Sequence, residues 1–442
     1  MVSSSQKQLR VAIVGSGISG LAVAHKLRGL ADVTLFEAGD YFGGHTHTVD
    51  VSLPGANGLV THGVDTGFLV FNERTYPHLI KLFAELEVKT APSDMSFSVK
   101  VAGAFGSQKA RTLEWSGSSL NSVFSQRSNL LRWKFLRMLR DIMRFNRITT
   151  ALAASNAEAD MLQPLDAFLI SHKFSIEFRD WYFLPMMGCI WSCPTDQMLQ
   201  FPVATMIRFC YNHGLIQVAN RPQWWTVAGG ARHYVEKIIA GIADKRLNTP
   251  VRWVERDAEG VCVITDAQTE RFDKVVLAAH SDQSLAMLRD PSRAEQQILG
   301  AIRYQANHAV LHTDSSVLPE KKLAWAAWNY ERAQEPERES ARVCLHYLLN
   351  MLQPLPFTQP VLVSLNPVSE IGRNHIMGEF DYTHPVFDLA AIHAQQGLVP
   401  LQGQQNTYYC GAWTGYGFHE DGLSSGLEVA RQLLLEAAGA SA

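Results

Sequence analysis

The sequence predicts an α/β fold built around a parallel sheet, and two observations lead to this prediction. Val11–Val14 and Asp32–Phe36 are short apolar runs typical of strands buried on both faces, and the helical pattern Leu21–Leu27 connects them. Two further runs of the same kind, Lys274–Ala279 and Thr407–Cys410, lie far downstream. We therefore expect distant parts of the chain to contribute strands to the fold.

A glycine-rich turn joins the first strand to the first helix with the spacing G-x-G-x-x-G. In such a turn the first glycine allows the bend, the second lets the backbone approach a pyrophosphate, and the third lets helix and strand pack closely. The helix start adds amide donors and the positive end of its dipole. The turn therefore predicts a dinucleotide site, contacted by Gly15, Gly17, Ile18, Ser19 and Gly20.

The end of the second strand narrows the choice of dinucleotide. Glu37 stands where an acid accepts hydrogen bonds from ribose hydroxyls, and Ala38 follows it. The glycine pair in Gly43-Gly44-His45-Thr46 resembles the extended signature of the glutathione-reductase-like flavoproteins, particularly the amine oxidase and phytoene desaturase superfamily. The resemblance implies that the cofactor is FAD and that this segment passes its pyrophosphate.

Three later segments resemble further conserved parts of the same superfamily. They are Asp65-Thr-Gly67, the strand pattern Pro250–Val254, and the glycine-rich stretch 411–426, which is followed by a helix to the end of the chain. In the superfamily the segment that matches Pro250–Val254 holds the adenine, and the segment that matches 411–426 contacts the pyrimidine side of the flavin. The resemblance implies FAD contacts at Gly67, Val251, Gly411, Asp421, Gly422 and Leu423.

The predicted FAD-binding segments are not contiguous. The resemblance implies a glutathione-reductase-like FAD-binding Rossmann domain formed by residues 1–90, 225–290 and 400–442, with an inserted mixed α/β substrate domain formed by 91–224 and 291–399. The sequence has no second G-x-G-x-x-G, so we expect no nicotinamide nucleotide site. Electrons from the substrate would then leave the flavin to oxygen, a quinone or a partner protein.

Longer stretches of the chain resemble one branch of this superfamily. They are Val70–Pro77, Ser93–Phe97, Ile190–Pro194, Phe209–His213, Arg221–Trp224 and Tyr416–Leu423. They are similar to the flavin oxidoreductase domain fused to plant cyclopropane fatty acid synthases and to its stand-alone bacterial relatives, often encoded beside lipid methyltransferases. Some of these relatives are associated with furan fatty acid formation, and a fatty acid isomerase belongs to the wider superfamily.

This resemblance implies an enzyme that desaturates or isomerises an unsaturated or methyl-modified fatty acyl chain by hydride transfer to the flavin. It also implies a lipid substrate and a lipid methyltransferase as partner. Two alternatives stay open at this point. One is a flavin amine oxidase, since imine formation uses the same hydride transfer. The other is a non-catalytic flavin-bound partner of the methyltransferase.

Four side chains are candidates for acid or base work. His419 and Glu420 lie in the segment expected to meet the flavin, and Tyr211 and His213 are further candidates. The alternative for each is a structural role. The aromatic and methionine-rich stretch Phe183–Trp191 is either a wall of an acyl pocket or ordinary core. In the same region Cys189 and Cys193 could form a redox pair, although their spacing favours buried thiols.

A basic stretch at residues 127–147 holds seven basic side chains and one acidic side chain. Apolar side chains recur in it at helical spacing, at Leu131, Phe135, Met138, Leu139, Ile142 and Phe145. Arg137, Arg140, Arg144 and Arg147 form a polar stripe. Such a helix either lies on an anionic membrane surface or packs on a core with a solvated basic face.

Composition sets broad limits on partners and location. The formal net charge of −3 steers no polyanion to the protein, so we expect no nucleic acid partner. The six cysteines show neither a disulfide framework nor paired C-x-x-C units, so we expect no metal site and a reducing, cytoplasmic setting. We find no secretory signal and no run of 18 apolar residues. A soluble protein, or one peripheral to the inner face of the membrane, is expected.

Overall fold

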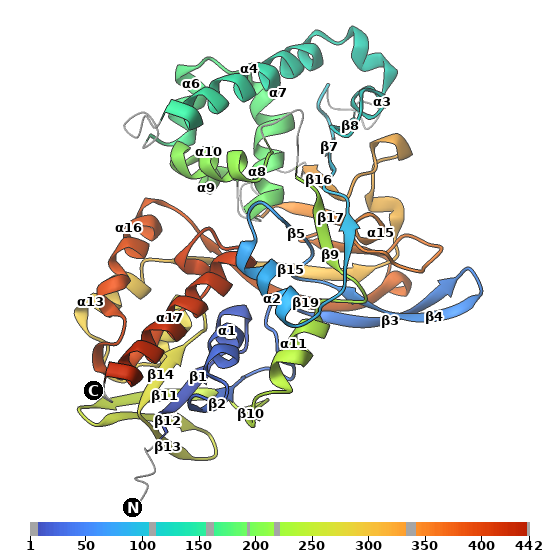
Figure 1. Cartoon of the computed structure of the whole chain (residues 1–442). Coiled ribbons are helices and arrows are strands. Elements are labelled where there is room, and N and C mark those ends of the chain that lie inside the picture. The colour runs from blue at the N-terminus through green and yellow to red at the C-terminus, as the bar shows by residue number, and fades with distance from the viewer. Residues whose placement is uncertain are drawn as a thin grey trace, which may run out of the picture.

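The computed structural model describes residues 8–105, 112–155, 163–191, 195–215, 222–332 and 342–439. A five-stranded sheet with the order β10-β2-β1-β14-β20 lies in its lower half (Figure 1). Every pairing in this sheet is parallel, which confirms the predicted α/β class. Its strands come from distant parts of the chain: β1 (Arg10–Val14), β2 (Asp32–Phe36), β10 (Asp244–Arg246), β14 (Lys274–Leu277) and β20 (Thr407–Tyr409).

The parallel sheet is buried on both faces. Val11 and Ile13 of β1 join a core with α1 (Ile18–Leu27) and the C-terminal helix α17 (His419–Gly439). Ala12 and Val14 point the other way, into a second core. That core also includes residues of the antiparallel sheet of β11 (Val251–Asp257), β12 (Gly260–Thr265) and β13 (Thr269–Phe272). Since both faces are covered, β1 needs an apolar residue at each position from Val11 to Val14, as the sequence predicts.

The C-terminal helix begins earlier than the sequence predicts. We expected the glycine-rich stretch to run to Gly426, but α17 begins at His419. A Cβ on Gly426 would lie 2.3 Å from the Ser19 carbonyl oxygen, and one on Gly422 would lie 2.9 Å from a methyl group of Ile18. The correction has a physical reason, since both glycines let α17 approach α1 closely.

A seven-stranded mixed sheet forms the middle of the molecule, with the order β19-β15-β18-β17-β16-β7-β8. Only the β7–β16 pairing is parallel among the described strands of this sheet. All seven strands fall within the insertions at 91–224 and 291–399, although the domain boundaries themselves stay a prediction. They are β7 (Phe97–Val101), β8 (Leu113–Ser116), β15 (Arg303–His312), β16 (Trp328–Arg332), β17 (Cys344–Leu348), β18 (Leu362–Leu365) and β19 (Ile376–Val386).

Small elements connect the two large sheets. β3 (Thr48–Gly55) and β4 (Gly58–Asp65) form a hairpin. β5 (Phe71–Asn72), β9 (Trp224–Val227) and β6 (Thr90–Ser93) form an antiparallel sheet in that order. The remaining helices around the sheets include α2 (Pro77–Glu85), α3 (Leu120–Val123), α11 (Arg232–Ile239), α12 (Ser281–Met287), α13 (Arg293–Leu299), α15 (Leu349–Leu352) and α16 (Leu389–Gly397).

Helices form most of the top of the molecule in Figure 1, with β7 and β8 beside them. These helices are α4 (Trp133–Ser155), α6 (Leu165–Ser171), α7 (Ile176–Phe178), α8 (Leu184–Trp191), α9 (Thr195–Leu199) and α10 (Val203–Asn212). Aromatic rings fill the space between them; the Phe145 ring, for example, lies 5.3 Å from the rings of Phe178 and Phe183. No helix among the described residues is long and apolar enough to cross a membrane.

The predicted basic stretch 127–147 faces the core with part of its apolar side. Phe135, Met138 and Phe145 are fully buried, so they are unavailable to a membrane. Two arginines of the predicted polar stripe are used inside the protein: Arg137 pairs with Glu177, and Arg144 donates to the His172 carbonyl. Arg140 and Arg147 are exposed.

Candidate active site

A cavity of about 720 Å³ begins at the carboxyl ends of β1, β2, β14 and β20. The glycine turn after β1 and the segments after the other three strands line one end, and side chains of the seven-stranded sheet and of the helices α8 and α10 line the other. Open α/β sheets bind ligands at this edge, outside the carboxyl ends of the strands.

The glycine turn leaves room for a ligand at one position only. The φ of Gly15 is +104°, and its N–H donates to the Phe36 carbonyl at 2.8 Å. A Cβ on Gly20 would lie 2.0 Å from the Gly15 carbonyl oxygen. A Cβ on Gly17 would meet no protein atom within 4 Å. The open space at Gly17 therefore lies at the N-terminus of α1, where amides and the helix dipole favour a pyrophosphate.

A second glycine loop and an acid complete this end of the cavity. The Cα of Gly17 lies 3.2 Å from where a Cβ of Gly44 would be, so the two loops touch. Glu37 accepts hydrogen bonds from the Ser16 amide at 2.9 Å, the Ser16 hydroxyl at 2.6 Å and the Gly39 amide at 2.9 Å. Three bonds leave an ionised carboxylate able to accept another, for instance from a ribose hydroxyl.

His45 follows the second glycine loop and lines the cavity. Its Nε2 is buried and has no hydrogen-bond partner among the described residues. Burial, with a smaller effect of the nearby His384, lowers the pKa of His45 to about 3, so the ring is neutral. An unpaired buried polar atom is costly, and a ligand hydroxyl would satisfy it. With the open space at Gly17 and the placing of Glu37, these residues fit FAD.

The other predicted FAD contacts fall into two groups. Ala38, Gly43, Gly67, Val251 and Gly411 line the cavity. Thr46, Asp421, Gly422 and Leu423 do not line it; Thr46 bonds the Tyr234 hydroxyl, and Leu423 is fully buried in the core. Burial raises the pKa of Asp421 to about 6, while its carboxylate accepts from the Phe418 amide at 2.9 Å. Residues of the second group therefore lie outside the cavity lining and support the residues that form it.

Two of the four predicted acid or base residues line the cavity, His213 and His419. His419 stacks on Phe68 with ring centroids 3.9 Å apart, and its Nε2 lies 2.7 Å from the Tyr234 hydroxyl. Burial lowers the pKa of His419 to about 3. Thus His419 is a neutral ring held on both sides, able to position a neighbour in the cavity.

One ring nitrogen of His213, Nε2, has no hydrogen-bond partner among the described residues. The other nitrogen, Nδ1, lies 2.9 Å from the Phe209 carbonyl oxygen. A carbonyl oxygen can only accept a hydrogen bond, so Nδ1 carries the proton and Nε2 carries the lone pair. The ring stacks on Phe209 at 3.9 Å, and burial lowers the pKa of His213 to about 4. A neutral imidazole with an open lone pair is able to accept a proton from a substrate.

Glu420 and Tyr211 do not line the cavity. Both carboxylate oxygens of Glu420 accept hydrogen bonds from the first amides of α2, those of His78 at 2.8 Å and Leu79 at 3.0 Å. The Tyr211 ring lies 5.5 Å below the Arg74 guanidinium. In this structure Glu420 therefore caps a helix, and Tyr211 takes part in a surface cation–π contact.

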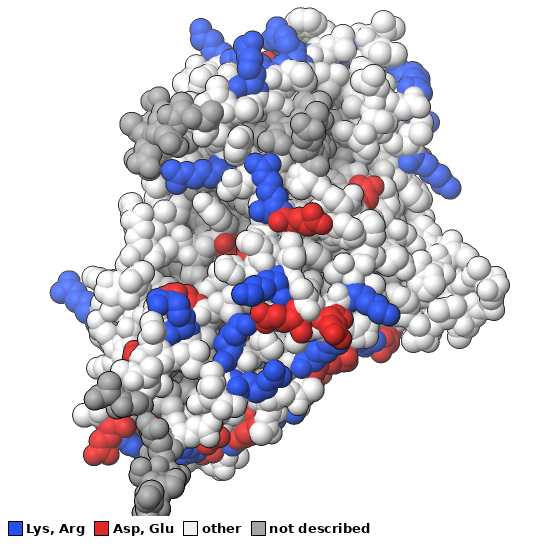
Figure 2. All heavy atoms as spheres, viewed as in Figure 1, with Lys and Arg blue, Asp and Glu red and all other residues white. Residues whose placement is uncertain are grey.

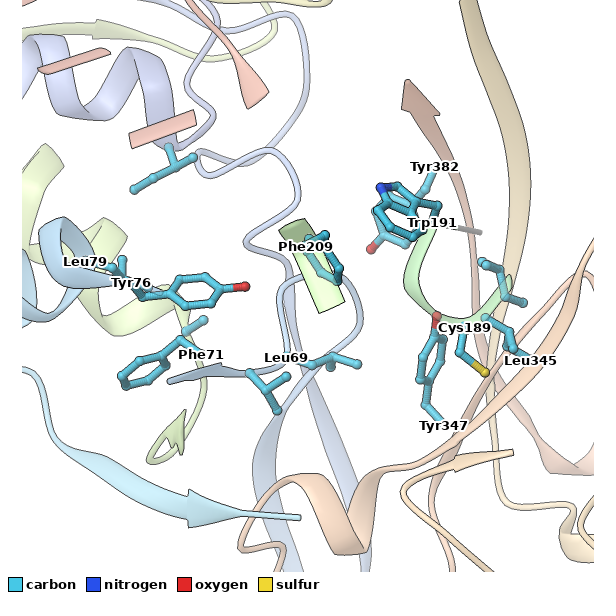
Figure 3. Close-up of a cluster of buried hydrophobic side chains, with 14 of the residues drawn as sticks. Leu69, Phe71, Tyr76, Leu79, Cys189, Trp191, Phe209, Leu345, Tyr347 and Tyr382 are labelled. Atoms are coloured by element: carbon cyan, nitrogen blue, oxygen red, sulfur yellow. The ribbon is translucent and has the colours of Figure 1, made fainter. Parts of the chain in front are cut away.

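The sequence indicated only the Phe183–Trp191 part of the far wall of the cavity, and the rest of that wall was missed. It consists of apolar and aromatic side chains from several elements, including Leu69, Tyr76, Trp224, Trp328, Tyr347, Val363, Leu365 and Tyr382. Figure 3 shows Tyr76 on one side, Phe209 and Leu69 in the middle, and Cys189 and Tyr347 on the other side. Alternation along 380–384 was an available signal, since it places Tyr382 and His384 on one face of a strand.

The stretch Phe183–Trp191 is partly wall and partly core. Cys189 and Ile190 line the cavity, whereas Phe183 and Met187 are fully buried. Burial raises the pKa of the Cys189 thiol, as expected for a buried thiol rather than a reactive one. Its proposed redox partner Cys193 lies outside the described residues.

Solved flavoenzymes share this fold. A CLA-producing fatty acid isomerase from P. acnes has a TM-score of 0.66 at 16% identity, over 97% of this chain and 99% of that chain. Putrescine oxidase bound to putrescine has a TM-score of 0.67 at 17% identity, over 97% of this chain and 99% of that chain. Cyclohexylamine oxidase from Brevibacterium oxydans IH-35A has a TM-score of 0.65 at 16% identity, over 96% of this chain and 99% of that chain. Identities this low establish the fold alone. No curated protein sequence matches the chain.

One family model covers most of the sequence. The model for flavin containing amine oxidoreductases matches residues 18–354, which begin within the glycine turn and include the β3–β4 hairpin, the helices α4 to α10 and the strands β7, β8, β15, β16 and β17 of the seven-stranded sheet. This match agrees with the cavity at the strand ends and with the flavin enzymes that share the fold. The chain belongs to the flavin containing amine oxidoreductase family and is an FAD-dependent oxidoreductase.

Proposed function

We propose that this oxidoreductase removes a hydride from an unsaturated or methyl-modified fatty acyl chain and thereby desaturates or isomerises it. One observation carries the proposal. Glu37, at the dinucleotide end, is the only Asp, Glu, Lys or Arg among the described residues that line the cavity. The far wall is apolar and aromatic, which suits an acyl chain and offers no carboxylate to an ammonium group.

Two further points support an acyl substrate. The branch-specific stretches resemble oxidoreductases associated with fatty acid modification, and one protein of the same fold is a fatty acid isomerase. The cavity histidines are neutral, so they add hydrogen-bonding groups without adding charge to the apolar site. An association with a lipid methyltransferase is part of the same proposal.

The residues divide the work as follows. Bound FAD supplies the hydride acceptor. The aromatic wall orients the acyl chain and excludes water. For a desaturation a proton must also leave the chain, and His213 Nε2 is the base in our proposal. An isomerisation is redox-neutral, so the hydride must also return to the chain; His213 Nε2 would hold the proton until both return at carbons that shift the double bond.

Anaerobic mixing tests the proposal directly. The holoenzyme is mixed with phospholipids that carry unsaturated or methylated chains, and the oxidised-flavin absorbance is followed, with mass spectrometry of the chains. We expect bleaching for desaturation, or a shifted double bond without net bleaching for isomerisation. Bleaching by a panel of amines with no response to lipid would overturn the proposal in favour of an amine oxidase.

A matched pair of variants ties the activity to the cavity. Ile190→Phe narrows the far end, whereas Ile176→Phe places the same ring on an exposed position of α7 outside the cavity. We expect Ile190→Phe to lower kcat/KM for lipid at least about tenfold, or about 1.4 kcal/mol in the barrier, and Ile176→Phe to have no effect. Equal rates in both variants would count against binding in this cavity.

A further inference from the structure

The outer side of α4 carries apolar side chains where a helix of a globular protein usually carries polar ones. Trp133 is 66% exposed, Leu136 is 37% exposed and Met143 is 60% exposed. These residues follow one another at spacings of three and seven, so they share one face with the exposed Arg140 and Arg147. The buried residues of α4, such as Phe135 and Phe145, point the opposite way.

The segment before α4 extends this face. A short 3-10 helix, Arg127–Leu131, leads into α4 and ends at Leu131, which is 92% exposed. Arg127 and Lys134 are exposed on either side of it. We name the α4 outer surface as the set Leu131, Trp133, Leu136 and Met143 together with Arg127, Lys134, Arg140 and Arg147.

No exposed acid lies in this part of the chain. Asp141 is the only acidic residue between 120 and 155, and it is 1% exposed. Its carboxylate accepts a hydrogen bond from the Ser175 amide and lies 3.6 Å from the Arg144 guanidinium. In Figure 2 blue spheres lie along the top of the molecule, over α4, and most red spheres lie in the lower half.

We propose that the α4 outer surface docks onto a lipid bilayer that contains anionic phospholipid. The four apolar side chains would enter the headgroup region, where tryptophan is favoured, and the four basic groups would meet lipid phosphates. Docking does not depend on the proposed function, because it is measured without turnover. If both hold, the helical layer places the apolar end of the cavity near the source of acyl chains.

The arrangement fits a bilayer better than a protein partner. Protein interfaces need a continuous, dry apolar centre and are poor in lysine. Here basic residues alternate with the apolar ones, so no such centre exists: Lys134 follows Trp133, and Arg140 lies between Leu136 and Met143. A bilayer tolerates this mixture, because its headgroups accept the charges while its acyl boundary accepts the apolar side chains.

Vesicle binding by the holoenzyme tests the apolar part. Vesicles of saturated phosphatidylglycerol and phosphatidylcholine offer charge without oxidisable double bonds, and pure phosphatidylcholine is the reference. We expect the double variant Leu131→Ser/Trp133→Ser to bind at least about tenfold more weakly than wild type. Leu59→Ser is the matched control, since Leu59 is 76% exposed on the β3–β4 hairpin. Flavin absorbance verifies that each variant is folded and loaded.

Charge reversal tests the electrostatic part. Arg140→Glu/Arg147→Glu should abolish the preference for phosphatidylglycerol, and high salt should weaken wild-type binding. Lys81→Glu/Lys89→Glu makes the same change of net charge on exposed residues at and after α2, and it should retain the preference. Equal binding to neutral and anionic vesicles would overturn the role of the basic residues.

Depth quenching completes the test. Brominated lipids should quench part of the tryptophan fluorescence in wild type, and Trp133→Phe should remove that part while binding persists. The proposal fails if wild type does not bind vesicles, or if the double variant binds as well as wild type. It also fails if the wild-type protein forms a dimer in solution that Leu131→Ser/Trp133→Ser dissociates, since the surface would then be a protein interface.

Discussion

Gly17 and Gly20 belong to one turn but stand in different surroundings. A Cβ on Gly20 would overlap the Gly15 carbonyl, whereas a Cβ on Gly17 would project into open space at the helix start. We expect Gly20→Ala to destabilise the apoprotein by about 1–3 kcal/mol through overpacking. We expect Gly17→Ala to leave the apoprotein Tm unchanged and to weaken FAD binding at least about tenfold.

Thermal unfolding of the apoprotein and titration with FAD separate these two effects. A Gly17→Ala apoprotein that melts well below wild type would show that the position serves the fold and not the cofactor. The apoprotein Tm is the discriminating quantity, because an overpacked core in Gly20→Ala would also lower FAD affinity by an indirect route.

His213 gives a prediction on pH. Because burial lowers the pKa of His213 to about 4, its imidazole is neutral and able to accept a proton at any pH well above 4. Turnover should therefore be flat from neutral pH downwards and should fall as the pH drops through about 4. His213→Gln should lower kcat and remove this inflection while retaining flavin absorbance. An unchanged pH profile in that variant would exclude His213 as the base.

Glu420 shows why a site cannot be read from sequence alone. Phe418 and His419, which precede it in sequence, line the cavity, but its partners are two amides at the start of α2, far away along the chain. We expect Glu420→Ala to cost about 0.5–2 kcal/mol of stability through loss of the helix cap and to change kcat little. Chemical denaturation and steady-state rates of the same variant check both statements.

At the scale of elements, the first turn of α17 couples stability to pH. The pKa of Asp421 is about 6 in the folded protein and 3.8 for the free side chain, so folding binds a proton between these values. The contribution of Asp421 to stability is therefore greatest below pH 4 and is lost as the pH rises to about 6. The loss is at most about 3 kcal/mol.

Asp421→Asn keeps the shape of the side chain but replaces the titratable carboxyl group with an amide that does not titrate. The Tm of wild type should fall relative to that of the variant as the pH rises from 4 to 6, and the gap should stay constant at higher pH. Other buried acids, such as Asp65, titrate equally in both proteins, so the difference isolates Asp421. Parallel Tm curves would contradict the prediction.

Elements fixed by local sequence were predictable. The β1–α1–β2 unit follows from apolar runs, a glycine turn and helical periodicity within 30 residues or so, each with a direct physical reason. The start of α17 was not predictable from the local sequence, because the close packing of two of its glycines against α1 is a long-range contact. Most of the far wall of the cavity was missed for the same reason: Tyr347, Val363 and Tyr382 meet only through strand pairing.

At the scale of the whole molecule, the cofactor should hold separate segments together. The cavity touches the turn after β1, the residues before β11, the end of β14 and the segment after β20. We expect FAD in thousandfold excess over its Kd to stabilise the protein by about 4 kcal/mol. Hydrogen exchange should slow in all four segments when FAD is added. Protection of the first segment alone would mean that the cofactor does not bridge them.

The position of β20 and α17 has a consequence for synthesis. β20 forms one edge of the parallel sheet, and α17 covers α1, so the core around β1 stays open until residues 407–439 have left the ribosome. During translation the nascent protein therefore exposes the apolar surface of α1 for roughly 20–80 s at about 5–20 residues per second and cannot yet retain its flavin. Chaperone contact should concentrate on α1 in this interval, and flavin supply should govern yield only after release.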